Sequence, residues 1–190
     1  MLTRRDYLAL TAQLGAAFAL PARLFAQAAG PVITRAIPKT GEMLPIVGLG
    51  SSATFSQVAG ADDVAAIRAV FAALLEQGGT VFDTAPGYGA SEEVAARAVN
   101  EAKVADRLFW ATKLNVAPRG GSADPARARE QVETSLKLVG RDKIDLIQVH
   151  NVADMATQFP ILEEYKQAGR VRYIGTTSTW HSAAATTSIS

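Results

Sequence analysis

Four polar residues have side chains that together could catalyse a proton transfer. Asp83, Lys113 and His150 each lie at the end of a short apolar run, and Tyr88 follows Asp83 by five positions. A tyrosine hydroxyl has an ordinary pKa of about 10, and the ammonium of Lys113 is expected to lower the pKa of Tyr88. Asp83 would keep the lysine charged and in place, and His150 would donate a hydrogen bond to a substrate oxygen.

These roles are what the reduction of a carbonyl group to an alcohol requires, namely a proton donor and a clamp for the oxygen. No side chain can supply a hydride, so a nicotinamide or flavin cofactor is required. Taken singly, each residue also has an ordinary structural explanation, as a helix cap, a loop aromatic, a solvated cation or a satisfied histidine. Their joint occurrence at successive strand ends favours the catalytic interpretation.

The chain alternates short apolar runs with amphipathic helical patterns. A hairpin with a turn at Gly41 is expected first, over residues 32–47. The expected strands are residues 46–50, 81–83, 108–112, 144–149 and 171–175. The expected helices lie between them, over residues 64–75, 91–103, 125–139 and 161–168, with Asp62, Asp63, Ser91 and Asp124 as capping residues.

Short apolar strands that alternate with helices indicate a parallel sheet, either an open doubly wound sheet or a closed barrel. Hydrophobic periodicity does not separate the two. Gly48-Leu49-Gly50 runs into Ser51, so the glycine fingerprint of dinucleotide-binding sheets is missing. Polar residues at the strand ends favour the barrel, in which those ends converge on one rim. We therefore expect an α/β fold: strands 1–5 of a partial (β/α)8 TIM barrel, preceded by an N-terminal β-hairpin.

The segment 82–92, Phe-Asp-Thr-Ala-Pro-Gly-Tyr-Gly-Ala-Ser-Glu, resembles the D-T-A-x-x-Y-G-x-S-E motif of the aldo/keto reductases. Segments 111–114, 144–150 and 169–175 are also similar to that family and occur in the expected order, so that the resemblance covers residues 33–178. It implies reduction of an aldehyde or ketone by NADPH on a barrel without a metal ion.

The resemblance also implies a role for each residue of the candidate site. Tyr88 would be the general acid and base, with Lys113 and Asp83 as the pair that tunes it. His150 would orient the carbonyl group, and Asn151 would face the substrate together with Tyr88 and His150.

The same resemblance implies residues that bind the cofactor. Gly50 and Ser51 would lie near the nicotinamide ribose, beside Asp83. The family usually has a Ser-Asn pair after the fifth strand, where this chain has Thr177 and Ser178. A hydroxyl supplies only one donor, so the contact with the nicotinamide amide is expected to be weaker or rearranged. The choice between NADPH and NADH stays open.

The N-terminus has the features of an export signal. Arg4-Arg5 precedes a weakly apolar run over residues 8–20, and residues 26–28 read Ala-Gln-Ala. The run is shorter than the roughly 20 residues that a membrane span needs, so residues 1–28 are expected to be a twin-arginine signal peptide. The mature protein would then be periplasmic and free of the membrane. The alternative is an ordinary amphipathic N-terminal helix on a cytoplasmic protein.

Composition excludes several classes of function. Cysteine is absent, which excludes disulfides, thiolate metal sites and cysteine nucleophiles, and only two histidines occur, of which His181 has no matching role. The formal net charge of +1 in 190 residues gives no electrostatic basis for binding nucleic acid. The expected partner is a small carbonyl substrate.

A complete barrel takes about 250 residues, whereas residues 29–178 account for five of its strands. Residues 179–190 are rich in Ala, Thr and Ser and are expected to form an irregular tail. Open sheet edges would make residues 29–190 by themselves unstable or prone to self-association. Two other functions remain open: a non-catalytic remnant or NADPH-binding module, and, less favoured, a barrel enzyme with a phosphorylated substrate.

Overall fold

The computed structural model describes residues 31–60, 64–118 and 120–178. The chain divides into two compact units, residues 1–31 and 32–190, and every helix and strand described below belongs to the second unit. The predicted signal peptide, the predicted capping residues Asp62 and Asp63, and the predicted tail over residues 179–190 lie outside the described residues.

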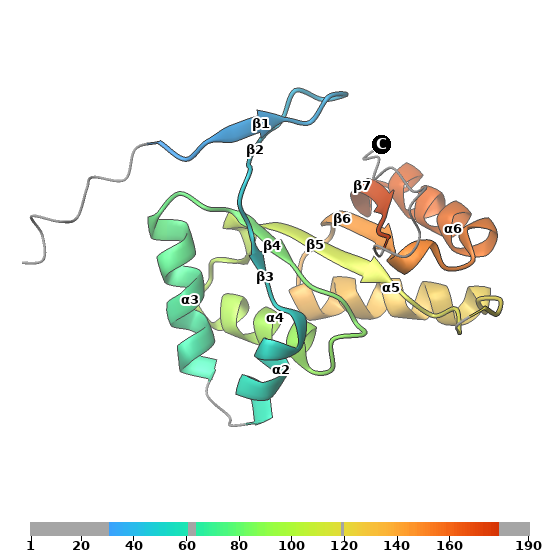
Figure 1. The fold of residues 1–190 in the computed structure, drawn as a ribbon, viewed down its shortest axis with the longest axis horizontal. Helices are drawn as coiled ribbons and strands as arrows, with labels where there is room; N and C mark the ends of the chain where they lie inside the picture. Colours follow the sequence, from blue (N-terminus) through green and yellow to red (C-terminus); the bar gives the residue numbers. More distant parts are fainter. Residues whose placement is uncertain (1–30, 61–63, 119, 179–190) are drawn as a thin grey trace, which may run out of the picture. The chain divides into compact units, whose positions relative to one another are not determined.

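Five parallel strands form one sheet in which each strand pairs with the next along the chain (Figure 1). A doubly wound sheet reverses its strand order partway, whereas this order rises without a reversal, as it does around a barrel. The strands are β3 (Leu49–Gly50), β4 (Val81–Asp83), β5 (Phe109–Leu114), β6 (Ile144–Val149) and β7 (Val171–Thr176). The expected parallel sheet of a partial barrel is thus confirmed.

Helices follow the strands and pack side by side on one face of the sheet, each against the next helix along the chain. Two short 3-10 helices, η2 (Ala105–Arg107) and η3 (His150–Val152), adjoin β5 and β6. The α-helices are α2 (Ser52–Gly60), α3 (Val64–Glu76), α4 (Ser91–Glu101), α5 (Pro125–Val139) and α6 (Met155–Gln167).

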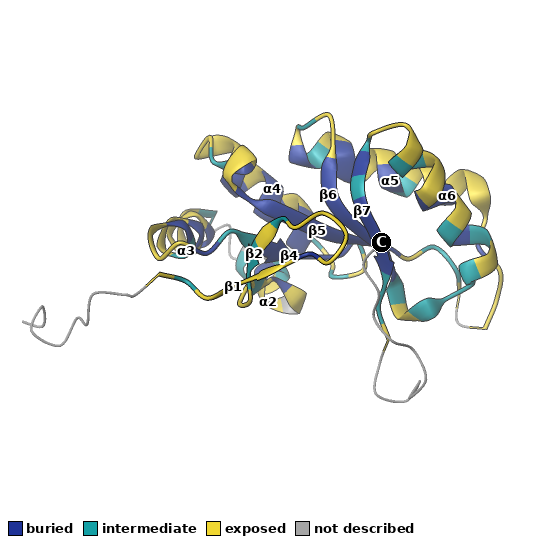
Figure 2. Cartoon of the chain, turned by 90° about the horizontal axis from the view of Figure 1, so that it is seen from above, coloured by how far each residue is buried: buried dark blue, intermediate teal, exposed yellow. Residues whose placement is uncertain are grey.

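The main core lies between the helices and the sheet, and the strands are buried along most of their length (Figure 2). An aromatic series runs through it, with ring centroids 4.9 Å apart for Phe71 and Phe82 and 4.7 Å apart for Phe82 and Trp110. Side chains alternate across a strand, so Phe109 and Lys113 of β5 face the other side from Trp110. A smaller cluster on that side consists of Ile37, Phe109, Ala111, Leu146 and Tyr173.

The predicted hairpin is present as β1 (Thr34–Ala36) paired antiparallel with β2 (Met43–Pro45). Its turn uses Gly41, whose positive φ of 72° suits glycine. Ile37 is buried in the smaller cluster, and Tyr173 of β7 bonds to Thr40 across 3.0 Å. The hairpin therefore lies against the sheet at the ends where the strands begin.

Several expected boundaries were wrong. The first strand contains only Leu49–Gly50, because Ile46 and Val47 are exposed and unpaired with β4. The helix α2 was not expected. Ser91 does not cap α4: Ala90 occupies the cap position, and the Ser91 hydroxyl donates to the carbonyl oxygen of Ser52.

The last helix begins at Met155 and not at residue 161. Pro160 lies inside it and obscured the helical pattern. The first turn is held instead by the fully buried Gln158, whose amide accepts a hydrogen bond from the Val116 N–H and donates one to the Ala153 carbonyl. The start of this helix therefore depends on tertiary hydrogen bonds, which the spacing of apolar residues along the sequence does not reveal.

Candidate active site

The ends of three neighbouring strands, and the loop that follows the first of them, bring the predicted catalytic residues to one rim of the sheet. Asp83 is the last residue of β4, Lys113 lies next to the last residue of β5, and His150 directly follows β6. Tyr88 lies in the loop between β4 and α4, where its N–H donates to the Ala85 carbonyl. Because all these strands run in one direction, residues that are far apart in the sequence meet here.

Lys113 and Asp83 form a tight ion pair. The ammonium nitrogen lies 2.7 Å from each carboxylate oxygen of Asp83 and 2.9 Å from the carbonyl oxygen of Thr84. An ammonium has three N–H donors, and these three acceptors account for all of them. The Lys113 side chain is 5% exposed and that of Asp83 is 42% exposed, so the pair opens towards solvent on its acidic side.

Tyr88 and His150 lie beside this pair. Their rings meet edge to face, with centroids 5.9 Å apart and planes at 80°. The Lys113 ammonium is 5.8 Å from the centroid of the Tyr88 ring. All four predicted catalytic residues are therefore grouped, and both rings are partly accessible to a ligand.

The pKa of Tyr88 contradicts the expectation from sequence. Burial, and then the negative charge of Asp83, raise the pKa of Tyr88 above its ordinary value. The expected lowering by Lys113 does not prevail: its ammonium lies 2.7 Å from both carboxylate oxygens of Asp83, whose negative charge adds to the effect of burial. The phenol of Tyr88 is consequently protonated at neutral pH and can act as a donor.

His150 shifts in the opposite direction. Burial, and then the positive charge of Lys113, lower the pKa of His150, while Asp83 partly opposes them. The imidazole is therefore neutral near pH 7 and carries one N–H. Its Nδ1 atom is buried without a hydrogen-bond partner in the part of the chain that the structure describes.

The residues predicted to bind a cofactor lie at the same rim. The N–H of Ser51 donates to the Asp83 carbonyl across 3.0 Å, and its buried hydroxyl donates to that of Thr84. A Cβ added to Gly50 would meet no atom within 4 Å, so the backbone there is open to close approach. Ser51 itself is committed to bonds within the protein.

Thr177 and Asn151 are joined at the rim beyond β6 and β7. The Thr177 hydroxyl accepts a hydrogen bond from the Asn151 N–H across 2.9 Å, and the Thr177 N–H donates to the Val149 carbonyl. Asn151 has a positive φ of 56°, a conformation that asparagine tolerates better than most residues. Ser178 is exposed at the end of the described segment.

Two buried polar residues near the site were missed from the sequence. Gln148 is 8% exposed and pairs in register with Lys113; it could have been found as the residue two positions before His150 on the same face. Glu92 is 4% exposed at the start of α4 and bonds to Thr112. Its signal was the Glu that ends the family motif over residues 82–92, to which we assigned no role from the sequence.

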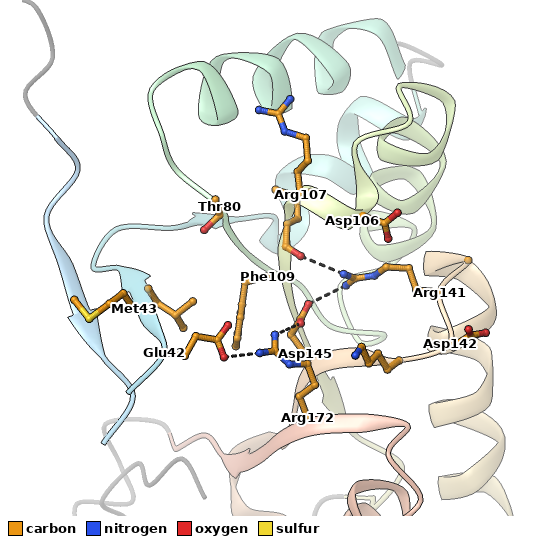
Figure 3. A pocket seen from close by; sticks show the side chains of 14 residues that line it. Glu42, Met43, Thr80, Asp106, Arg107, Phe109, Arg141, Asp142, Asp145 and Arg172 are labelled. Carbon is orange, nitrogen blue, oxygen red and sulfur yellow. Dashed lines mark hydrogen bonds and ion pairs between the residues drawn. The ribbon is translucent and has the colours of Figure 1, made fainter. Parts of the chain in front are cut away.

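A hollow of about 400 Å³ adjoins Tyr88, lined by residues of its loop and of α2: Ser52, Ser56, Gln57, Gly87, Tyr88 and Gly89. A larger one of about 730 Å³ lies at the other end of the strands, beneath the hairpin (Figure 3). There Arg172 bonds to Glu42 and to Asp145, and Arg141 also bonds to Asp145. These ion pairs attach the hairpin to the sheet, and none of the four predicted catalytic residues lines that hollow.

Two searches were confined to residues 31–60, 64–118 and 120–178. Among them, no group of three or more His, Asp or Glu side chains has an arrangement suited to a metal ion. No helix within the same ranges combines the length and the apolar character needed to cross a bilayer.

Comparison with known proteins identifies the family. Residues 46–187 match the model of the aldo/keto reductase family. The chain is 36% identical over 149 residues to the aldo-keto reductase YhdN of Bacillus subtilis, covering 73% of this chain and 45% of that protein. It is 30% identical over 155 residues to the L-galactose dehydrogenase of Arabidopsis thaliana, covering 75% and 47%.

Solved structures agree with the fold. The Bombyx mori aldo-keto reductase in complex with NADP superposes with a TM-score of 0.61 and 25% identity over 78% of this chain and 51% of that one. The parallel sheet carries Asp83, Lys113 and His150 at the ends of its strands, with Tyr88 in the adjoining loop. The chain belongs to the aldo/keto reductase family. It spans about half the length of the curated relatives that it matches.

Proposed function

We propose that the protein reduces an aldehyde or a ketone to an alcohol with NADPH, and that Tyr88 delivers the proton. The observation that carries this proposal is the Lys113–Asp83 ion pair with Tyr88 and His150 beside it at one rim. Family membership supports the same reaction class. The identity of the carbonyl substrate is left open.

Each residue has a role that follows from its protonation state. The protonated phenol of Tyr88 gives its proton to the carbonyl oxygen as the alcohol forms. Neutral His150 donates a hydrogen bond to that same oxygen and so orients the carbonyl carbon. The Lys113–Asp83 pair fixes the arrangement of charges around the phenol.

The rim suits a nicotinamide cofactor. The Bombyx mori aldo-keto reductase was solved in complex with NADP. The open backbone at Gly50 leaves room for a ligand beside Asp83. Gly50, Asp83, Thr177 and Ser178 would contact the cofactor, and the buried Ser51 would support them through its bonds to Asp83 and Thr84. When bound, NADPH supplies the hydride that the carbonyl carbon receives. Because the Thr177 hydroxyl already accepts from Asn151, Thr177 can still donate one hydrogen bond to the carboxamide.

Replacing Tyr88 with phenylalanine tests the proposal. Tyr88→Phe removes the proton donor and keeps the ring, so turnover over a panel of aldehydes and ketones should fall by about 100-fold or more, with the NADPH Kd nearly unchanged. Tyr165→Phe is the matched control, because Tyr165 lies on α6 and its hydroxyl donates a hydrogen bond to the backbone carbonyl of Arg129. Full turnover by Tyr88→Phe would disprove the assignment, and NADPH binding without turnover in the unmodified protein would favour a binding module.

A further inference from the structure

Glu92 is a buried carboxylate that the proposed reaction does not use. It is the second residue of α4 and is 4% exposed. One carboxylate oxygen accepts a hydrogen bond from the Thr112 hydroxyl across 2.5 Å, and the other accepts one from the Ser135 hydroxyl across 3.1 Å. Burying a carboxylate is costly even when it is bonded, so its place here calls for more than a packing explanation.

Thr112 links Glu92 to the reactive groups. Thr112 directly precedes Lys113 on β5, and successive side chains of a strand point to opposite faces. Glu92 therefore bonds to β5 on the face of the sheet that the helices cover, while the Lys113 side chain lies on the opposite face. Burial raises the pKa of Glu92, whereas its two hydroxyl partners and the charge of Lys113 act in the opposite direction.

The loop that carries Tyr88, residues 84–90, is held at both ends by consecutive residues of β5. At its beginning, the Thr84 carbonyl accepts a hydrogen bond from Lys113. Just after its end, Glu92 accepts one from Thr112. The first contact fixes where the loop leaves the strand. The second attaches the start of α4 to β5, while bonds from the Ala90 N–H to Ser56 and from the Ser91 hydroxyl to Ser52 attach the same end to α2.

We propose that Glu92 is a positioning residue that fixes the end of the Tyr88 loop on β5 through Thr112, and so sets the placement of the Tyr88 hydroxyl relative to Lys113. This inference rests on the proposed role of Tyr88 in proton transfer. A displacement of about 1 Å in a reacting group can cost roughly 100-fold in rate, so a second attachment for this loop has a direct catalytic value.

The two hydrogen bonds of Glu92 provide a matched pair of variants. Thr112→Val removes the bond to β5, and Ser135→Ala removes the bond to α5, which carries no residue of the site. Both remove one buried hydroxyl and should lower the Tm to a similar extent. Only Thr112→Val should lower kcat, by roughly 10-fold, while KM for the carbonyl substrate stays nearly constant.

A conservative variant separates geometry from charge. Glu92→Gln keeps an oxygen that can accept from Thr112 and an amide that can donate to Ser135, so it should retain most of kcat. Because the loop stays attached to β5, the alkaline limb of the pH–rate profile should keep its position in Glu92→Gln, whereas it should move in Thr112→Val as Tyr88 is displaced relative to Asp83. Ultraviolet titration of tyrosinate, with Tyr88→Phe as the blank, measures the same shift without turnover.

Equal kcat values for Thr112→Val and Ser135→Ala would overturn the positioning role, as would an unshifted Tyr88 titration in Thr112→Val. Failure of the proposed function has a different signature. In that case Tyr88→Phe remains active, while the titration of Tyr88 still responds to the bond between Glu92 and Thr112.

Discussion

The Lys113 ammonium lies 2.7 Å from both carboxylate oxygens of Asp83, and the lysine end of the pair is buried while the carboxylate end is open. The Lys113 side chain is thus held in place by the two oxygens of Asp83 and the carbonyl of Thr84. Its charge is balanced at short range, so the pair changes the field at Tyr88 less than a lone ammonium would. The phenol therefore keeps its proton, which suits a donor in the direction of reduction.

Lys113→Met tests the value of this pair. The ammonium and its ordering effect on Asp83 are lost, so we expect turnover to fall by about 100-fold or more. Stability should change little, because methionine fills the same buried space and the Asp83 carboxylate is already partly solvated. Steady-state kinetics and thermal unfolding followed by circular dichroism measure both quantities.

Lys143→Met is the control for loss of a lysine charge. Lys143 is exposed just before β6, at the opposite end of the strands from the site. Lys143→Met should leave both turnover and Tm nearly unchanged. If Lys113→Met and Lys143→Met had the same turnover, the ion pair with Asp83 would have no part in catalysis.

The pH dependence of reduction follows from the two shifted groups. Tyr88 must be protonated, and burial together with Asp83 raises its pKa, so activity should persist until above about pH 10. Neutral His150 is required as a donor, and its lowered pKa moves its protonation below about pH 6.5. We therefore expect kcat/KM for reduction to be flat between these limits.

Oxidation of the alcohol by NADP⁺ should behave differently, because it needs the Tyr88 phenolate as the base. Its rate should rise with pH throughout the range in which reduction is flat. An alkaline limb for reduction near pH 7 would show that Lys113 lowers the pKa of Tyr88, as the sequence alone suggested, and that Asp83 does not neutralise it.

The grouping of Asp83, Lys113 and His150 could be predicted because parallel strands end at one rim whatever their loops do. Spacing along the chain was sufficient to place them. Tyr88 was placed by its motif, since a loop residue has no such geometric constraint. The direction of the pKa shift of Tyr88 could not be predicted, because it depends first on how far the phenol is buried and then on its distance from Asp83, neither of which can be read from the sequence.

Glu92 and the start of α6 were missed for a common reason. The partners of Glu92, Thr112 and Ser135, lie 20 and 43 residues away along the chain. Gln158, which holds the first turn of α6, likewise bonds to Val116, 42 residues away. Buried polar contacts of this kind depend on tertiary packing, so the spacing of apolar residues along the sequence does not predict them.

The N-terminal segment carries a further prediction. We propose that residues 1–28 direct export of the folded protein, because Arg4-Arg5 precedes a weakly apolar run. Replacing both arginines with lysine keeps the charge and should retain the protein in the cytoplasm of a bacterial host. Immunoblots of periplasmic and cytoplasmic fractions measure this. Unchanged export of the double variant, or a cytoplasmic location of the unmodified protein, would contradict the proposal.

The ion pairs beneath the hairpin should contribute to stability and not to catalysis. Asp145 is 5% exposed and accepts hydrogen bonds from the Arg141 and Arg172 side chains and from the backbone N–H of Trp110. Asp145→Ala leaves these donors unsatisfied in a largely buried place, which should cost about 3 kcal/mol of the free energy of unfolding. Chemical denaturation measures this cost, and the turnover of the folded fraction should be unchanged because the site lies at the other end of the strands.

Asp142→Ala is the matched control for Asp145→Ala. Asp142 lies three residues earlier in the same segment and is exposed, and its backbone carbonyl accepts a hydrogen bond from Arg170. Its loss should change the free energy of unfolding by less than about 0.5 kcal/mol. Equal stability of the two variants would mean that Arg141 and Arg172 find water when Asp145 is removed. A selective fall in turnover for Asp145→Ala would instead mean that the beginning of β6 transmits strain to His150 at its end.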